Sequence, residues 1–248
     1  MSNKRVKYKE APLVEVICQL RFPTILSINA NEPVDFQEAI RDEFPLYNCK
    51  NEQKTEVLDD KEVRISKNRT YEFITKSTRT KVTVTSSFIA FSTLEYEVWE
   101  DFREVILKVL KKFVSIYKVP FYIRCGLRYK DIITKSRYGL SGKKWSELIL
   151  PNVIGIAADI EDERIESFSL DTEYKQTAST YTHNMFRFVH FNGSEEISLL
   201  LDCDYYCKEL TEKSDVEGIL NTLHSHSSNF VSNSITLLLE TAMKPVSI

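Results

Sequence analysis

The chain has 248 residues, of which 42% are hydrophobic and 28% are charged, and its net charge is −3 at neutral pH. This composition is typical of a folded protein with one large or two small domains, and it excludes a disordered chain. The basic segment Lys4–Lys9 is followed by no apolar stretch, and no apolar run is long enough to span a membrane. We therefore expect a cytoplasmic protein without membrane association.

The first half of the chain predicts a strand, a short helix, further strands and a long helix. Apolar residues alternate over Leu13–Phe22, which is typical of a strand, and recur every three to four residues over Glu97–Lys118, which is typical of a helix. The alternation changes phase near Ser86-Ser87, which predicts a bulge or a bend, and Lys67-Asn68-Arg69 is turn-like. The other expected elements are a short helix over 35–40 and strands near 55–58, 62–66, 71–76 and 81–92.

The second half predicts the same order of elements. A strand is expected over Tyr122–Ile133, followed by a short helix over Lys144–Leu150 that ends at Pro151. A long helical region, Asp215–Met243, closes the chain and is expected to break around Ser225–Ser234. The strands between these helices are predicted near 165–175, 181–191 and 197–208.

A short phrase occurs in the first strand of each half. The first copy is Cys18-Gln19-Leu20-Arg21-Phe22, and the second is Cys125-Gly126-Leu127-Arg128-Tyr129. Together with the repeated order of elements, this predicts an α+β protein built from duplicated β-α-β(3-4)-α units, with antiparallel sheets and long helices packed on one face. We expect the units to cover residues 1–119 and 120–248, either as two domains or as one continuous pseudo-symmetric domain.

Three motifs carry a resemblance to a known family. The segment Pro12–Phe22, PLVEVICQLRF, resembles the start of a sporadically distributed family of uncharacterised prokaryotic proteins of similar length. Gly126–Tyr129, GLRY, is similar to its mid-chain signature, although Lys130-Asp131 stands where an Asn commonly follows. Leu223-His224 is similar to its C-terminal pattern, which continues with Phe230 and Ile235-Thr236. The resemblance implies an α+β fold and a bacterial or archaeal origin, suggests mobile or defence-linked loci, and implies no activity.

No sequence motif identifies a reaction. The six glycines form no phosphate-binding loop, and the four histidines and five cysteines form no metal-ligand pattern, so we expect no cofactor, no metal site and reduced cysteines. Asp202 and Asp204 share one face of a strand, as paired catalytic carboxylates do, but their apolar neighbours predict that they lie on a solvated surface. A hydrolase with a composite site is therefore the least favoured function.

Charge is divided unevenly along the chain. Residues 1–134 hold 23 basic and 19 acidic side chains, whereas residues 135–248 hold 10 and 17. Arg21 and Arg128 occupy equivalent places in the repeated phrase and could flank an anion-binding groove, or pair with nearby acids. The candidate partner- or anion-binding residues are thus Arg21, Arg128, Arg64, Arg69 and Arg79.

These observations favour a non-enzymatic binding or regulatory protein that acts through a protein partner. The alternative is an anion or nucleic-acid binder that uses the basic first half, since duplicated strand-and-helix units also occur in saddle-shaped DNA-binding proteins. The isoelectric point of about 5.9 counts against that alternative, because phosphate binding normally requires a strongly basic face.

Overall fold

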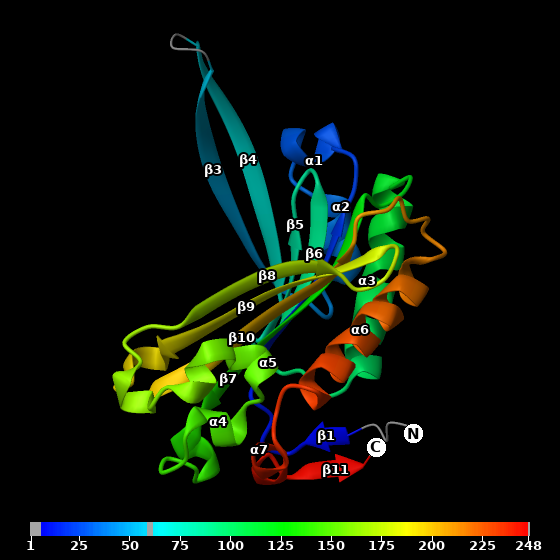
Figure 1. The fold of residues 1–248 in the computed structure, drawn as a ribbon. Helices are drawn as coiled ribbons and strands as arrows, with labels where there is room; N and C mark the ends of the chain where they lie inside the picture. Colours follow the sequence, from blue (N-terminus) through cyan, green and yellow to red (C-terminus); the bar gives the residue numbers. More distant parts are fainter. Residues whose placement is uncertain (1–5, 59–61, 248) are drawn as a thin grey trace.

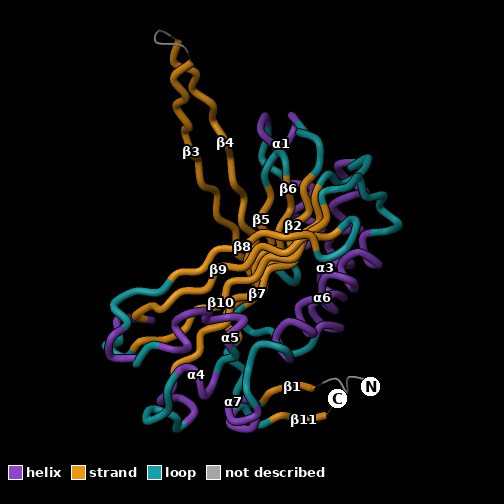
Figure 2. The backbone as a smooth tube through the Cα atoms, viewed as in Figure 1, coloured by secondary structure: helices purple, strands orange, loops and turns teal. Residues whose placement is uncertain are grey.

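The computed structural model describes residues 6–58 and 62–247, and side chains are described for these residues except 52–68 and 247. Its helices lie beside a large antiparallel sheet, which confirms the expected α+β class (Figures 1 and 2). The strands are β1 (Val6–Tyr8), β2 (Leu13–Arg21), β3 (Leu46–Leu58), β4 (Glu62–Ile74), β5 (Thr80–Val84), β6 (Phe88–Thr93), β7 (Arg124–Thr134), β8 (Ser169–Lys175), β9 (Thr180–His190), β10 (Ile197–Cys207) and β11 (Pro245–Ser247). The helices are α1 (Leu26–Ala30), α2 (Val34–Ile40), α3 (Trp99–Tyr117), α4 (Trp145–Leu148), α5 (Pro151–Ile154), α6 (Val216–Ser232) and α7 (Leu237–Ala242), with 3₁₀ turns η1 (Lys135–Tyr138), η2 (Gly155–Asp159), η3 (Asp162–Arg164) and η4 (Phe191–Gly193).

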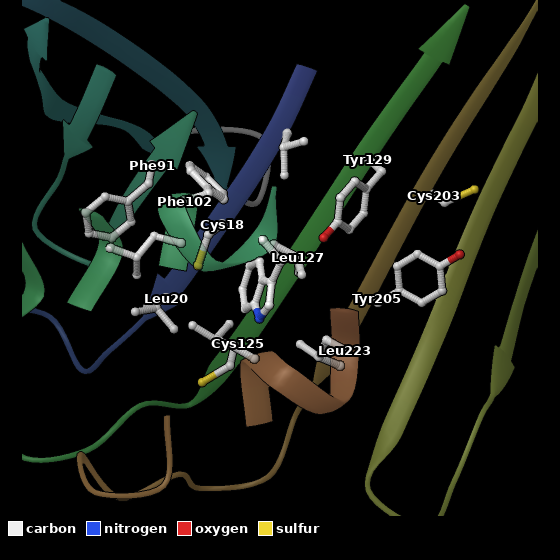
Figure 3. Packing of buried hydrophobic residues seen from close by; sticks show 14 of the residues in the cluster. Cys18, Leu20, Phe91, Phe102, Cys125, Leu127, Tyr129, Cys203, Tyr205 and Leu223 are labelled. Carbon is white, nitrogen blue, oxygen red and sulfur yellow. The ribbon is translucent and has the colours of Figure 1, made fainter. Parts of the chain in front are cut away.

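The two strands that carry the repeated phrase lie side by side near the middle of the sheet. The strand order is β3-β4-β5-β6-β2-β7-β10-β9-β8. β2 and β7 are antiparallel, with Cys18 opposite Leu127 and Leu20 opposite Cys125. These four side chains are buried, and Figure 3 shows them packed near Leu223 of α6. Residues from both expected units, 1–119 and 120–248, therefore contribute to one continuous sheet.

The long helix α3 buries the stripe that its sequence predicts. Its first turn carries Glu100 and Asp101, whose negative charges are stabilised by the positive end of the helix dipole. The helix ends where Lys118 adopts a left-handed conformation with φ of 51°. The apolar residues that recur over this segment belong to the same buried cluster as the strand residues; they include Trp99, Phe102, Ile106, Leu110 and Phe113.

One long hairpin replaces the separate short strands expected between residues 55 and 76. β3 and β4 pair from Leu46 opposite Ile74 to Leu58 opposite Glu62, and the hairpin projects beyond the body of the sheet (Figure 1). The prediction of a turn at Lys67-Asn68-Arg69 is wrong, because these residues lie inside β4; the connection at 59–61 lies outside the described residues. This part of the sequence lacks the apolar alternation by which a strand is recognised.

Three further segments are expected to bend or end regular elements, with different outcomes. The chain bends at Ser86-Ser87, which is one of the two expected alternatives, and the Thr85 N–H donates to the Phe88 carbonyl at 2.9 Å where β6 begins. Pro151 begins α5 instead of only ending α4, because proline is well accommodated in the first turn of a helix. α6 continues as far as Ser232, and the helical region breaks at 233–236, which overlaps the end of the stretch where a break is expected.

A small ribbon holds the two ends of the described chain together. β1 pairs antiparallel with β11, so that Val6 is opposite Ser247 and Tyr8 is opposite Pro245. Two further hydrogen bonds extend the contact, from the Lys9 N–H to the Lys244 carbonyl and from the Glu10 N–H to the Met243 carbonyl. Figure 1 shows this ribbon below α6, beside α7.

Among the helices that the structure describes, none combines the length and the apolar character needed to cross a membrane.

Candidate functional site

Ion pairs across neighbouring strands cover the polar face of the sheet, which we define by Arg124 and Arg128 of β7 and Asp202 and Asp204 of β10. The Arg128 guanidinium donates from Nε and Nη2 to the two carboxylate oxygens of Asp202, each at 2.5 Å. Arg124 Nη2 donates to Asp204 Oδ2 at 2.7 Å. The two aspartates are therefore not on a solvated surface as expected; Asp202 is only 6% exposed. They neutralise arginines and do not form a catalytic pair.

Hydrogen bonding and burial raise the pKa values of two groups on this face. The hydrogen bonds to Asp202 raise the pKa of Arg128 above its ordinary value, so this guanidinium stays charged. Burial raises the pKa of Asp204 in spite of the neighbouring Arg124. Both effects are typical of a structural ion-pair network, in which each arginine is already occupied.

The five predicted arginines do not converge on one site. Arg21 lies opposite Arg124, and its Nε donates to Gln19 Oε1 at 3.1 Å, whereas Arg128 lies opposite Ile17, four positions along the strand. Arg79 lies after β4 and donates from Nη2 to the Leu94 carbonyl at 2.6 Å. Arg69 is in β4, where a hydrogen bond with Tyr71 raises its pKa, and Arg64 is in the same strand with its side chain outside the described residues. Arg21 and Arg128 thus lie at separate positions along the β2–β7 pair, each with its own local partner.

A cavity of about 580 Å³ lies on the opposite face of β7 from the ion pairs, between the terminal ribbon and the long helices. Its walls come from β1, the start of α3, β7, α6 and α7. This is the volume of a small-molecule site, and its lining combines aromatic and apolar side chains with many polar and charged ones. The residues that line it include Tyr8, Tyr96, Trp99, Tyr129, Asp131, His224, Ser227 and Glu240.

Asp131 places a carboxyl group in the wall of this cavity. It lies two residues after Tyr129 on β7, so both side chains are on the face of the strand that carries Cys125 and Leu127. Asp131 is 9% exposed, and no hydrogen bond or ion pair to its carboxyl is found among the described residues. Burial alone raises its pKa from 3.8 to about 7. A buried carboxyl without a partner carries a desolvation cost that a suitable ligand would offset.

A connected set of aromatic and polar groups forms the neighbouring wall. The Tyr129 hydroxyl and His224 Nδ1 are 2.9 Å apart, and the His224 ring stacks on Trp99 with a centroid separation of 4.9 Å. Trp99 Nε1 in turn donates to Asn221 Oδ1 at 2.8 Å. These contacts join β7, α3 and α6, and they fix the orientation of the aromatic rings around the cavity.

The terminal segments close the remaining side. The Tyr8 hydroxyl lies 3.4 Å from Glu240 Oε1, and burial together with this carboxylate raises the pKa of Tyr8 to about 12. Lys7 Nζ pairs with Glu97 Oε2 at 2.9 Å, which ties β1 to the segment before α3. Lys7 is the only lysine or arginine in the described lining, and its charge is already matched by an acid.

No sequence pattern points to this cavity, although several of its residues lie in the motifs described above. Tyr129 ends the GLRY phrase, Asp131 stands where an Asn commonly follows that signature, and His224 belongs to the C-terminal pattern. The signal was present in the strand itself, because Asp131 interrupts the apolar series Cys125, Leu127 and Ile133 at a position that faces the core. The cavity residues from the other segments do not interrupt an apolar pattern in this way.

The chemistry of the described lining favours hydrogen bonding and cation binding over metal ligation. Among the described residues, no group of three or more His, Cys, Asp or Glu side chains is arranged to hold a metal ion. All five cysteines are free thiols. A scan against protein-family models found no match to this sequence, and a search of curated proteins found none either.

Proposed function

We propose that this chain is a non-enzymatic binding and regulatory protein of the cytoplasm, whose cavity takes up a small ligand. The observation that carries this proposal is the position of Asp131, a buried and unpartnered carboxyl in the wall of an aromatic-lined cavity. The Asp131 oxygens are not among the fully buried polar atoms that lack a hydrogen-bond partner, so they face the space of the cavity and a ligand there can reach them. A ligand that pairs with the carboxyl would offset part of the desolvation that raises its pKa.

The regulatory part of the proposal rests on the ribbon of β1 and β11. Tyr8 belongs both to this ribbon and to the cavity wall, so a bound ligand would contact the ribbon directly. The ribbon also presents Val6 and Val246, which are 37% and 39% exposed. A protein partner that docks on the ribbon would therefore respond to whether the cavity is filled. The prokaryotic origin and the link to mobile or defence loci rest on the family resemblance alone.

Native mass spectrometry of the full chain, purified from its own host, tests the ligand-binding proposal. We expect a small molecule to co-purify with the wild-type protein and with Thr222→Leu, a control on the exposed side of α6. Ser227→Leu and Ser228→Leu extend side chains into the cavity wall and should lose it. The proposal is wrong if the wild-type protein carries nothing, or if folded cavity variants retain the same molecule as the control.

The partner proposal has a separate test. Cross-linking in host cells should join the wild-type protein to a partner through the ribbon, and the yield should change in Ser227→Leu relative to Thr222→Leu. Equal yields from the two variants would contradict a link between the cavity and the partner, whereas the small-molecule result would stand by itself.

An enzyme with a composite site is the second candidate, because one specific observation favours it. Asp131 has a pKa of about 7, which suits a general base, and the Tyr129–His224 pair lines the same cavity. Mass spectrometry separates the two candidates. A co-purified molecule that is unchanged after incubation with excess protein supports binding alone, whereas conversion that stops in Asp131→Asn supports catalysis.

The nucleic-acid alternative receives less support from the geometry. Arg124 and Arg128 are paired with aspartates, and Arg79 lies 3.8 Å from Glu95. A phosphate backbone would have to compete with these carboxylates, which reduces the electrostatic gain on which such binding depends.

We also propose that the chain is an internal duplication. The support is the register at the centre of the sheet, where Gln19 of one repeated phrase lies opposite Gly126, its counterpart in the other. Strands β6, β5 and β4 extend outward from β2 in the order in which β10, β9 and β8 extend from β7. A twofold axis through the Gln19–Gly126 pair would relate these strands, and the long helices α3 and α6 would then cover the same face. Superposing residues 10–118 on 121–243 should align the paired strands and the two long helices.

A further inference from the structure

We propose that the cavity binds an organic cation, an ammonium or amidinium group attached to a small apolar body. This inference rests on the function proposed above and names the class of ligand. The observation behind it is the balance of charge in the cavity wall, combined with the aromatic side chains of the same wall.

The described lining has more carboxyl groups than cationic side chains. It contains Glu97, Asp131 and Glu240, and Lys7 is the only lysine or arginine beside the three acids. Lys7 is paired with Glu97 at 2.9 Å. Asp131 has no partner among the described residues, and Glu240 is in contact with the neutral Tyr8 hydroxyl. Two carboxyl groups thus line the cavity without a lysine or arginine paired to them in the described part of the chain.

The aromatic rings favour the same ligand. Tyr8, Tyr96, Trp99 and Tyr129 all contribute to the wall. Aromatic faces carry partial negative charge and attract ammonium and guanidinium groups, and this attraction is stronger where water is excluded. A cation next to Asp131 would also bring the pKa of this carboxyl back toward its ordinary value, because a nearby positive charge stabilises the ionised carboxylate.

The other ligand classes fit less well. An anion would meet uncompensated carboxyl groups and only one lysine, which is already engaged. A purely apolar ligand would displace water from Asp131 and leave the carboxyl without any hydrogen bond. A neutral molecule could donate a hydrogen bond, but it would gain neither the charge-assisted bond nor the cation–π contact.

Three probes with the same ring and similar length test the inference: 2-phenylethylammonium, 2-phenylethanol and 3-phenylpropionate. The chain has two tryptophans, so Trp145→Phe leaves Trp99 as the single fluorescent reporter in the cavity wall. Fluorescence and calorimetric titrations then give the affinity of each probe. We expect the ammonium to bind at least roughly tenfold more tightly than the alcohol, and the carboxylate to give no Trp99 response.

Asp131→Asn is the decisive variant, with Asp42→Asn as an exposed control. The asparagine should reduce the affinity for the ammonium by roughly tenfold or more and leave that for the alcohol within about twofold, because only the charge is removed. Equal affinities for ammonium and alcohol, or no effect of Asp131→Asn, would overturn the ligand class. If 3-phenylpropionate alone changes the Trp99 signal, the class is wrong but the ligand-binding function stands. If no probe binds and nothing co-purifies from the host, both proposals fall.

Discussion

Replacing Asp131 with Asn should make the protein more stable at high pH but not at low pH. The unfolded chain loses the Asp131 proton near pH 3.8, whereas the folded protein holds it until the pH reaches about 7. Between these values the folded state binds more protons than the unfolded state, so the free energy of unfolding falls as the pH rises. Asp131→Asn removes this dependence because the amide does not titrate.

The size of the effect follows from the pKa rise. A rise from 3.8 to about 7 corresponds to about 4 kcal/mol of unfolding free energy, which is an upper value because the cavity admits water to the carboxyl. The introduced amide would also lack partners, which offsets part of the gain at high pH. We therefore expect Asp131→Asn to exceed wild type by about 1–3 kcal/mol at pH 8 and to match or fall below it at pH 4.

Urea denaturation at pH 4, 5.5, 7 and 8 measures this difference directly. The other titrating groups of the cavity, among them Glu97, His224 and Glu240, are present in both proteins and largely cancel in the comparison. Asp42→Asn should follow wild type at each pH, because Asp42 is exposed. If the difference in unfolding free energy between Asp131→Asn and wild type is constant from pH 4 to pH 8, the pKa of Asp131 is not raised in the folded state.

Three further predictions concern the core, the polar face and nucleic acid. Phe102→Ala should cost about 3–5 kcal/mol in chemical denaturation, since Phe102 is 6% exposed within the main cluster; a loss below about 1 kcal/mol would contradict this packing. Arg128→Met should cost about 3–5 kcal/mol by leaving Asp202 buried and unpaired, and the double variant with Asp202→Leu should recover most of it; no recovery would mean that the pair is not the cause. In a gel-shift titration at low salt, micromolar protein should not bind DNA or RNA. A shift that is steeply salt-dependent and abolished by Arg69→Glu with Arg79→Glu would establish the alternative instead.

The elements that could be predicted from the sequence are those with one buried face, because burial requires apolar residues at regular spacing. β2, β7 and α3 each place one face in the core, and their positions agree with the apolar patterns. The hairpin β3–β4 was divided wrongly because it extends beyond the sheet, where alternation is not required. The break expected in the serine-rich part of α6 occurs only at its end, after Ser232. Ser225 and Ser228 instead donate to the carbonyls four residues earlier, at 2.9 and 3.2 Å, which a helix tolerates.

The candidate site was much harder to predict than the fold. Arg128 was recognised as polar and outward-facing, but its partner on β10 is separated from it by more than seventy residues. The cavity depends on packing between the chain ends, two long helices and a central strand, and no short motif encodes that arrangement. Asp131 could have been found from its place on an apolar strand face, which is a one-residue signal, whereas Tyr8 and Glu240 could not.

The terminal ribbon also determines how the molecule should respond to mechanical force. The outer ends of β1 and β11, Val6 and Ser247, are paired with each other, so a force applied through the two chain ends acts on this one residue pair first. In this unzipping geometry the residue pairs separate one after another, whereas in strands loaded in shear all pairs resist the force together. Optical-tweezer extension should therefore show an early, low-force opening that removes Tyr8 from the cavity while the nine-stranded sheet is still intact.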